Sequence, residues 1–162
     1  MGKKTAKTNA ARILDKDNIP YEIIHYETED GLVDGISVAA KIGFPEEVVY
    51  KTLVAVGSSK QHYVFVIPVA DELDLKSAAK VSGEKKIEMA PVREIQSLTG
   101  YVKGGCSPVG MKKPFPTFIA SEAVNLEEII VSAGKIGVQL KLSPQDLLLL
   151  TGGQLAELTE NR

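Results

Sequence analysis

Residues 51–69 read KTLVAVGSSKQHYVFVIPV, two apolar runs rich in β-branched and aromatic side chains on either side of Gly57-Ser-Ser-Lys60. Such side chains favour strands because they fit a pleated, half-buried surface. A short turn of small residues between two runs of this kind is typical of an antiparallel hairpin. We therefore predict core strands over residues 51–56 and 62–69, with the other elements arranged around them.

Short amphipathic helices are predicted on both sides of this hairpin. In residues 8–18, 73–81 and 91–98 apolar residues recur at helical spacing, and Ile19-Pro20 stops the first of these helices. Ser37 and Ser143 are expected to cap two of the helices, and Gly43 and Gly152-Gly153 to end them. The predicted helices cover residues 8–18, 37–42, 73–81, 91–98 and 144–150, with a further helical turn at Pro45-Glu46-Glu47.

Further strands are predicted where β-branched and aromatic residues gather outside these helices, at residues 21–27, 117–120, 129–131 and 138–142. Residues 28–35, which are acidic and punctuated by glycine, are expected to form a loop. Helices and strands alternate without strict βαβ periodicity. We therefore expect an α+β fold with a mixed, barrel-like β-sheet surrounded by short helices. Without a linker or an internal repeat, residues 1–162 are expected to form one domain.

Composition and charge exclude several classes of protein. A chain of 162 residues can bury a substantial core, and its single cysteine excludes an intrachain disulfide and a cysteine-cluster metal site. No apolar run approaches membrane-spanning length, and no hydrophobic segment follows the basic residues 1–7, so we expect a cytoplasmic protein without a membrane partner. The net charge of −2 argues against wholesale coating of nucleic acid, although it leaves room for a local basic patch that faces a phosphate ligand, and no DNA partner is expected.

A glycine-rich basic loop is the first candidate for a binding site. Residues 101–113 read YVKGGCSPVGMKK, with Gly104-Gly105 ahead of Ser107-Pro108 and lysines on both sides. Paired glycines let the backbone approach a ligand, and proline fixes one dihedral angle. The loop fits one wall of an anion site, and it equally fits an ordinary basic surface loop. The paired glycines do not belong to a Walker or dinucleotide-binding fingerprint, so they predict no nucleotide site.

Lys51 is the second candidate, because it places a charge at the start of an apolar strand. A lysine at a strand end can point into the mouth of a cavity and hold a phosphate or a polarised oxygen. The alternative is a lysine whose ammonium group reaches solvent past the strand. Residues 132–137, Ser-Ala-Gly-Lys-Ile-Gly, are predicted to form a second small-residue turn. That turn is either a plain hairpin connection or another wall of the same pocket.

The usual catalytic groups are not brought together by the sequence. Cys106 has lysines nearby that would lower the pKa of its thiol, which suggests a nucleophile. His25 and His62 are the only histidines, however, and both lie in predicted strands with no indication that either approaches Cys106. A packed thiol is therefore favoured. Scattered acidic residues and two isolated histidines predict neither a metal site nor a carboxylate pair, and no cofactor is expected.

Five motifs follow one another along the chain: Lys51-Thr-Leu53, Leu75-Lys-Ser-Ala-Ala-Lys80, residues 101–113, Val131-Ser-Ala-Gly-Lys135 and Leu142-Ser-Pro-Gln-Asp-Leu147. Together they resemble the bacterial YbaK/EbsC family of Cys-tRNA(Pro) deacylases, which are relatives of the editing domain inserted in bacterial prolyl-tRNA synthetases. The resemblance extends from the opening helix to the closing one. Several motifs in the right order make it far more specific than any one of them.

The resemblance implies partners and residue roles. The 3′ end of Cys-tRNA(Pro) is the implied substrate, with prolyl-tRNA synthetase as a second partner. Lys51 matches the family's essential lysine, expected to contact the 3′-terminal adenosine or its phosphate. Gly104 matches the glycine whose backbone approaches the scissile carbonyl. The remaining positions expected to bind the substrate or shape its pocket are Tyr26, Thr52, Gly105, Ser107, Pro108, Ser132, Gly134 and Lys135.

The reaction implied by the resemblance needs no nucleophile from the protein, because the substrate's own thiol attacks its ester carbonyl and releases a cyclic thiolactone. Two alternatives remain open. One is deacylation of another mischarged tRNA, such as Ala-tRNA(Pro), by an activated water, and the other is a module that binds aminoacyl-tRNA or a synthetase without turnover.

Two residues depart from the family pattern. Asp34 stands where relatives usually place an aromatic residue, and Ser37 where they usually have glutamate, which questions substrate fit if this loop borders the aminoacyl pocket.

Overall fold

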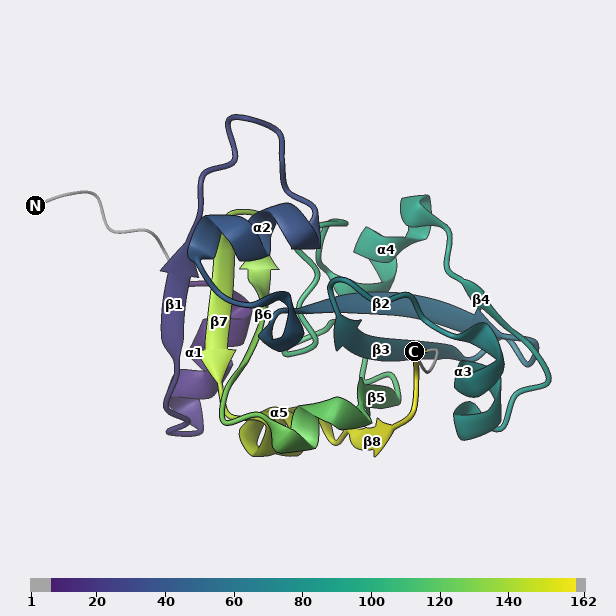
Figure 1. The fold of residues 1–162 in the computed structure, drawn as a ribbon. Helices are drawn as coiled ribbons and strands as arrows, with labels where there is room; N and C mark the ends of the chain where they lie inside the picture. The colour runs from purple at the N-terminus through teal and green to yellow at the C-terminus, as the bar shows by residue number, and fades with distance from the viewer. Residues whose placement is uncertain (1–6, 160–162) are drawn as a thin grey trace, which may run out of the picture.

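The computed structural model describes residues 7–159, which form two β-sheets with helices around them (Figure 1). No helix in this range is long and apolar enough to cross a membrane. The helices are α1 (Asn9–Lys16), α2 (Gly35–Ile42), α3 (Leu75–Ser82), α4 (Val92–Thr99) and α5 (Pro144–Thr151), with single 3₁₀ segments η1 (Glu46–Val48) and η2 (Ser121–Asn125). The strands are β1 (Glu22–His25), β2 (Tyr50–Gly57), β3 (His62–Pro68), β4 (Ile87–Met89), β5 (Thr117–Ala120), β6 (Ile129–Lys135), β7 (Val138–Leu142) and β8 (Gln154–Ala156).

The predicted hairpin forms the centre of the larger sheet. β2 pairs antiparallel with β3 along nearly its whole length, with Leu53 opposite Phe65, which confirms the hairpin expected from residues 51–69. β4 adds antiparallel to β2, while β5 and β8 add in parallel on the other side, so the order is β4-β2-β3-β5-β8 and the sheet is mixed. The middle of β3 is fully buried, at Val64, Phe65, Val66 and Ile67.

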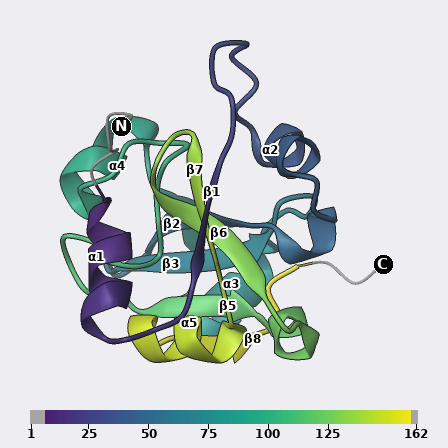
Figure 2. The ribbon, with the colours of Figure 1, turned by 90° about the vertical axis from the view of Figure 1, so that its left-hand side faces the viewer.

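A smaller antiparallel sheet, in the order β1-β7-β6, lies across the β2–β3 strands (Figure 2). One parallel bridge between Val49 and Ile130 joins the start of β2 to β6. Among residues 7–159 neither sheet closes on itself, so the barrel-like form expected from the sequence is not confirmed. The mixed α+β class is confirmed.

One hydrophobic core holds the two sheets together. It contains side chains from α1, β3, β6 and β7 that have no exposed surface, including Leu14, Val64, Val131 and Leu140. Burying a side chain of this size contributes about 1.5–3 kcal/mol. The relative position of the sheets, and of any site between them, is therefore fixed mainly by apolar packing.

The start of α2 differs from the sequence prediction. The helix begins at Gly35, and its N-cap is Asp34 rather than Ser37. The Asp34 carboxylate accepts hydrogen bonds from the Ser37 backbone N–H at 3.1 Å and from the Ser37 hydroxyl at 2.7 Å. The prediction for Ser37 is wrong because aspartate caps a helix as well as serine does, and it stands three residues earlier.

Three further segments differ from the sequence predictions. β4 and β8 are absent from them, because Ile-Glu-Met and Gln-Leu-Ala are too short to carry a strand pattern, and only their pairing with β2 and β5 makes them strands. Residues 132–135, predicted as part of a turn, continue β6 instead. The register of β6 is irregular between Ser132 and Lys135, where Gly134 has a φ of 102° that lets the strand bulge.

Glu84 ties the β2–β3 turn to the segment that follows α3. Its carboxylate accepts hydrogen bonds from the Ser59 backbone N–H (3.0 Å), the Ser59 hydroxyl (2.6 Å) and the Tyr63 hydroxyl (2.6 Å). The Ser59 hydroxyl bond first, and then the Tyr63 bond, lower the pKa of Glu84. The anionic form of Glu84 therefore stabilises the hairpin.

We expect Glu84→Gln to lower the Tm at neutral pH. A carboxyl whose folded-state pKa is lowered adds stability above its unfolded-state pKa, and this stability is lost as the pH falls through the folded-state pKa. The difference in Tm between wild type and variant should therefore close below about pH 4. Thermal unfolding followed by circular dichroism measures it, with the exposed Glu88→Gln on β4 as the matched control. A Tm difference that stays constant at every pH would contradict this account.

Candidate active site

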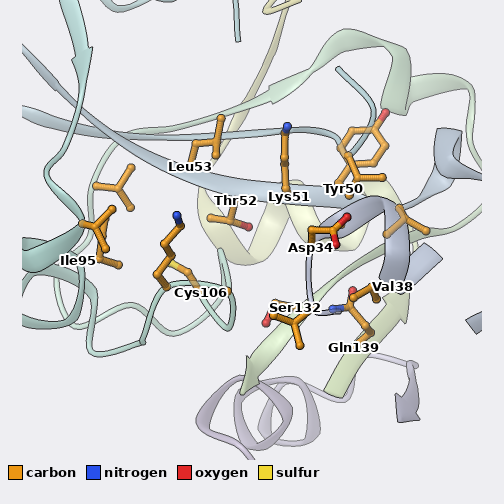
Figure 3. A pocket seen from close by; sticks show the side chains of 18 of the residues that line it. Asp34, Val38, Tyr50, Lys51, Thr52, Leu53, Ile95, Cys106, Ser132 and Gln139 are labelled. Carbon is orange, nitrogen blue, oxygen red and sulfur yellow. The ribbon is translucent and has the colours of Figure 1, made fainter. Parts of the chain in front are cut away.

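A cavity of about 430 Å³ opens beside β2, between the two sheets (Figure 3). Its walls come from the segment between β1 and α2, from β2 itself, from β4 and α4, from the loop after α4, and from β6 and β7. Half of the positions singled out from the sequence line this cavity: Tyr26, Lys51, Thr52, Gly104 and Ser132. The others lie outside its lining: Gly105, Ser107, Pro108, Gly134 and Lys135.

The cavity follows a part of the β2 edge that no other described strand covers. β4 pairs only with Ala55–Gly57, its last contact being the hydrogen bond from Ala90 N to Val54 O at 3.0 Å. At the other end, Val49 bridges to β6. Gly57 N–H donates to Gln61 O (2.9 Å) and Val49 O accepts from Val69 N (2.9 Å), both on the side of β2 that faces the β3 segment. Because these groups alternate along a strand, Thr52 turns its backbone N–H and C=O toward the open edge and the cavity.

Lys51 and Thr52 contribute side chains from opposite sides of β2. In Figure 3, Lys51 and Leu53 extend from one side of the strand and Thr52 from the other, where Ser132 and Gln139 lie. The Lys51 side chain is half-buried and takes part in none of the ion pairs formed by residues 7–159. The Thr52 hydroxyl is buried and has no hydrogen-bond partner. Both groups are therefore free to bind a ligand.

The loop after α4 closes one side of the cavity with its backbone. Gly104 lines the cavity and has a φ of 87°, a left-handed conformation that favours glycine. Gly105 packs directly against the β6–β7 turn, since a Cβ atom there would lie 2.9 Å from the backbone N of Ile136. Ser107 and Pro108 are buried behind this wall. These three residues support the loop and do not line the cavity.

β6 and β7 form the facing wall. Ser132 and Gln139 are directly paired across the two strands, and both line the cavity. Gly134 lets the ring of Tyr101 approach, because a Cβ atom there would lie 2.6 Å from a ring carbon. Gln139 is 7 % exposed and was missed by the sequence reasoning. The sequence offers one indication of its role, which is a polar residue between the apolar Val138 and Leu140. The face of the sheet that Gln139 occupies, however, depends on the register of β6 and β7.

The segment between β1 and α2 covers the remaining side, and Lys41 of α2 holds it in place. The Lys41 ammonium donates to Glu27 O (2.7 Å), Asp30 Oδ1 (2.7 Å) and Leu32 O (2.8 Å). It also lies 5.9 Å from the centre of the Tyr26 ring. Tyr26 and Asp34 line the cavity from this segment, which shows that the loop carrying the departures from the family pattern does border the pocket.

A family model for the aminoacyl-tRNA editing domain matches residues 33–150. The chain belongs to this family. A protein of Enterococcus faecalis named as a Cys-tRNA(Pro)/Cys-tRNA(Cys) deacylase, EbsC, is 47% identical over 158 residues, which is 97% of this chain and 96% of that protein. These matches confirm the resemblance found in the sequence.

Solved structures share the fold of this editing domain. One, described as a trans-editing enzyme for prolyl-tRNA synthetase, is 25% identical with a TM-score of 0.81, and the match covers 97% of this chain and 100% of that one. Another, the protein APE2540, is 22% identical with a TM-score of 0.85, covering 94% of this chain and 99% of that one. The second likeness concerns the fold alone.

Cys106 lines the cavity of this editing domain but is not an activated nucleophile. The residue is 8 % exposed, and burial raises the pKa of its thiol to about 11. A thiol with this pKa is protonated at neutral pH, whereas the thiolate is the reactive form. His25 and His62 do not line the cavity. Within residues 7–159 no group of three or more His, Cys, Asp or Glu side chains could hold a metal ion.

We expect Cys106→Ser to retain deacylase activity within about threefold of wild type, because a protonated thiol supplies no nucleophile. Release of a labelled amino acid from aminoacyl-tRNA measures the rate, and the Tm of each variant reports folding. Cys106→Ala is the matched control for lost volume. A loss of more than about 100-fold in Cys106→Ser, with the Tm unchanged, would establish Cys106 as a catalytic residue.

We expect Lys41→Met to raise the KM for aminoacyl-tRNA about tenfold with a smaller change in kcat. The variant keeps the aliphatic side chain but removes charge-assisted hydrogen bonds, each worth about 1.5–3 kcal/mol, that fix the wall carrying Tyr26. Steady-state kinetics and the rate of proteolysis between residues 28 and 33 measure the effect. Lys16→Met, an exposed lysine on α1, is the control. Unchanged KM together with unchanged proteolysis would exclude this positioning role.

Proposed function

We propose that this editing domain removes cysteine that has been attached to tRNA(Pro), acting as a separate trans-editing deacylase. The observation that carries the proposal is the cavity along the open edge of β2, where Lys51, Thr52 and Gly104 stand around one space. The 47% identical relative named as a Cys-tRNA(Pro)/Cys-tRNA(Cys) deacylase supports this choice of substrate. A volume of about 430 Å³ suits a small ligand, such as the aminoacyl ester with part of the terminal nucleoside.

In the proposed complex, Lys51 holds the 3′-terminal adenosine or its phosphate, because its ammonium is half-buried and has no ion-pair partner among the described residues. Gly104 presents its backbone to the scissile carbonyl. The side chains that contact the aminoacyl group are those of Tyr26, Thr52 and Ser132. The residues that support these walls from behind are Gly105, Ser107, Pro108 and Gly134. Lys135, at the end of β6, is exposed and lies outside the cavity lining.

The proposed chemical step takes place within the substrate. The cysteine sulfur attacks the ester carbonyl carbon, the bond between that carbon and the ribose oxygen breaks, and the departing oxygen gains the proton that the thiol loses. The products are a cyclic thiolactone and a tRNA with a free ribose hydroxyl. The protein contributes the orientation of the thiol and stabilisation of the carbonyl oxygen as it becomes negative. Such a step suits a cavity lined by a single carboxylate, Asp34, and by a protonated Cys106.

Selection of tRNA(Pro) is proposed to depend on a partner, prolyl-tRNA synthetase. The chain has a net charge of −2, so it offers limited positive surface for the body of a tRNA. The cavity can accommodate only the aminoacyl end, which is shared in structure by many tRNAs. Because tRNAs are charged in the cytoplasm, the protein is proposed to act there.

We expect wild type to release cysteine from Cys-tRNA(Pro), and Lys51→Ala to reduce kcat/KM about 10–100-fold, because a hydrogen bond between charged groups is worth about 1.5–3 kcal/mol. Release of labelled cysteine, with and without prolyl-tRNA synthetase, measures both rates. Lys113→Ala, which removes an exposed lysine outside the cavity, is the matched control. Equal rates for wild type and Lys51→Ala would exclude the role of Lys51.

The same release assay is repeated with Ala-tRNA(Pro), Ser-tRNA(Pro) and Pro-tRNA(Pro) as substrates. If the substrate thiol is the nucleophile, only the cysteinyl ester is released quickly and the thiolactone is trapped as product. Rapid release of alanine would instead indicate an activated water. Saturable binding of Cys-tRNA(Pro) without release would identify a binding module and overturn the proposed function.

A further inference from the structure

The charged groups that line the cavity differ in sign and position. Lys51 and Lys103 are cations, and Asp34 is the single carboxylate among the lining residues. An aminoacyl-tRNA end carries charges of both signs, since its phosphates are anionic and the α-amino group of its ester is cationic when protonated. The lysines suit the phosphates. An ammonium group, which has three donors and no acceptor, requires an oxygen acceptor.

The Asp34 carboxylate is held in a fixed orientation at the start of α2. Its two oxygens accept hydrogen bonds from the Ser37 hydroxyl at 2.7 Å and the Ser37 backbone N–H at 3.1 Å. The Ser37 hydroxyl bond first, and then the backbone bond, lower the pKa of Asp34, so the carboxylate is anionic at neutral pH. Two carboxylate oxygens provide about four acceptor positions, so capping leaves acceptor capacity for a ligand.

The position of Asp34 relative to the other walls suits a contact with the aminoacyl group. In Figure 3 its carboxylate appears between the part of β2 that carries Lys51 and Thr52 and the wall that carries Ser132 and Gln139. All of these residues line the same cavity. Gly104 lines this cavity as well, so a substrate bound against Gly104 shares one space with the Asp34 carboxylate.

We propose that the Asp34 carboxylate accepts the α-ammonium group of the aminoacyl ester and so determines specificity for substrates with a free amino group. The inference rests on the proposed function and adds to it a specificity that the cavity would impose. Anchoring the ammonium at Asp34 and the carbonyl at Gly104 fixes two of the substituents on Cα. The direction of the side chain, and with it the reacting thiol, then follows from the chirality of Cα.

This assignment predicts which esters are rejected. A substrate whose α-nitrogen is acylated, as in peptidyl-tRNA or formylated initiator tRNA, has lost the charge and has only one N–H to donate. It would lose the charge-assisted hydrogen bond to the exposed Asp34 carboxylate, and hydrogen bonds to charged groups are the stronger ones. The editing site would therefore spare N-acylated tRNAs during translation.

The test compares Cys-tRNA(Pro) with N-acetyl-Cys-tRNA(Pro) for wild type and Asp34→Asn. Asparagine caps a helix as well as aspartate does, so the variant removes the charge and keeps the start of α2. Wild type should cleave the acetylated ester at least about tenfold more slowly, and Asp34→Asn should cleave both at similar, reduced rates. Glu29→Gln, an exposed carboxylate in the same loop that does not line the cavity, should behave as wild type.

A binding measurement separates this role from a structural one. An unreactive analogue, cysteine joined through an amide to 3′-amino-3′-deoxyadenosine, should bind wild type about tenfold more tightly than its N-acetylated form. The ratio should fall to near one in Asp34→Asn. Because the acetyl group adds the same bulk for both proteins, a change in the ratio reports the charge pair and not the size of the acetyl group.

The outcomes distinguish the inference from the proposed function. Failure of wild type to release cysteine from Cys-tRNA(Pro) overturns the proposed function. Suppose instead that wild type releases cysteine, but the ratio of the rates on the free and acetylated esters is the same in Asp34→Asn as in wild type. This result overturns the role of Asp34 and leaves the proposed function standing. If Asp34→Asn does not fold, wild type alone decides, since equal rates on the free and acetylated esters also overturn the inference.

Discussion

The pairing of β2 with β3 is the constraint on which the rest of the structure depends. It runs along nearly all of β2, whereas β4 covers only the last residues of the opposite edge. An uncovered strand edge in solution invites pairing with another chain. Here the uncovered part of β2 faces a cavity closed by loops and by the second sheet. Its backbone groups are therefore protected from another strand and remain available to a small ligand.

The sequence alone predicts this framework and much of the site. Alternating apolar runs locate the hairpin, and the motifs around Lys51, Gly104 and Ser132 identify three cavity walls. Gln139 and Asp34 show where such reasoning stops. Whether Gln139 faces the cavity depends on its pairing with Ser132, and whether Asp34 caps α2 depends on competition with Ser37. The first depends on a tertiary contact and the second on two nearly equal local preferences. The short strands β4 and β8 likewise depend on tertiary pairing.

Some lysines of this chain have oxygen acceptors for their ammonium groups, and Lys51 differs from them. Lys141 lies between Glu22 (3.2 Å) and Glu128 (3.3 Å), and Lys41 has three oxygen acceptors. Lys51 is half-buried without such a partner among the described residues. A half-buried ammonium without a counterion has its hydrogen-bond donors available to an anionic ligand. Lys51 thus keeps unused binding capacity in the wall of the cavity.

The close approach of Gly105 to the backbone of the β6–β7 turn has a consequence for how the site could evolve. The glycine-rich loop and the turn are packed backbone against backbone at this point, so a shift of either one to admit a larger amino acid would displace the other. New substrate preferences would have to arise from exchanged side chains on β2, α2 or α4. The same packing sets this wall in place before a ligand binds, which lowers the cost of ordering the loop on binding.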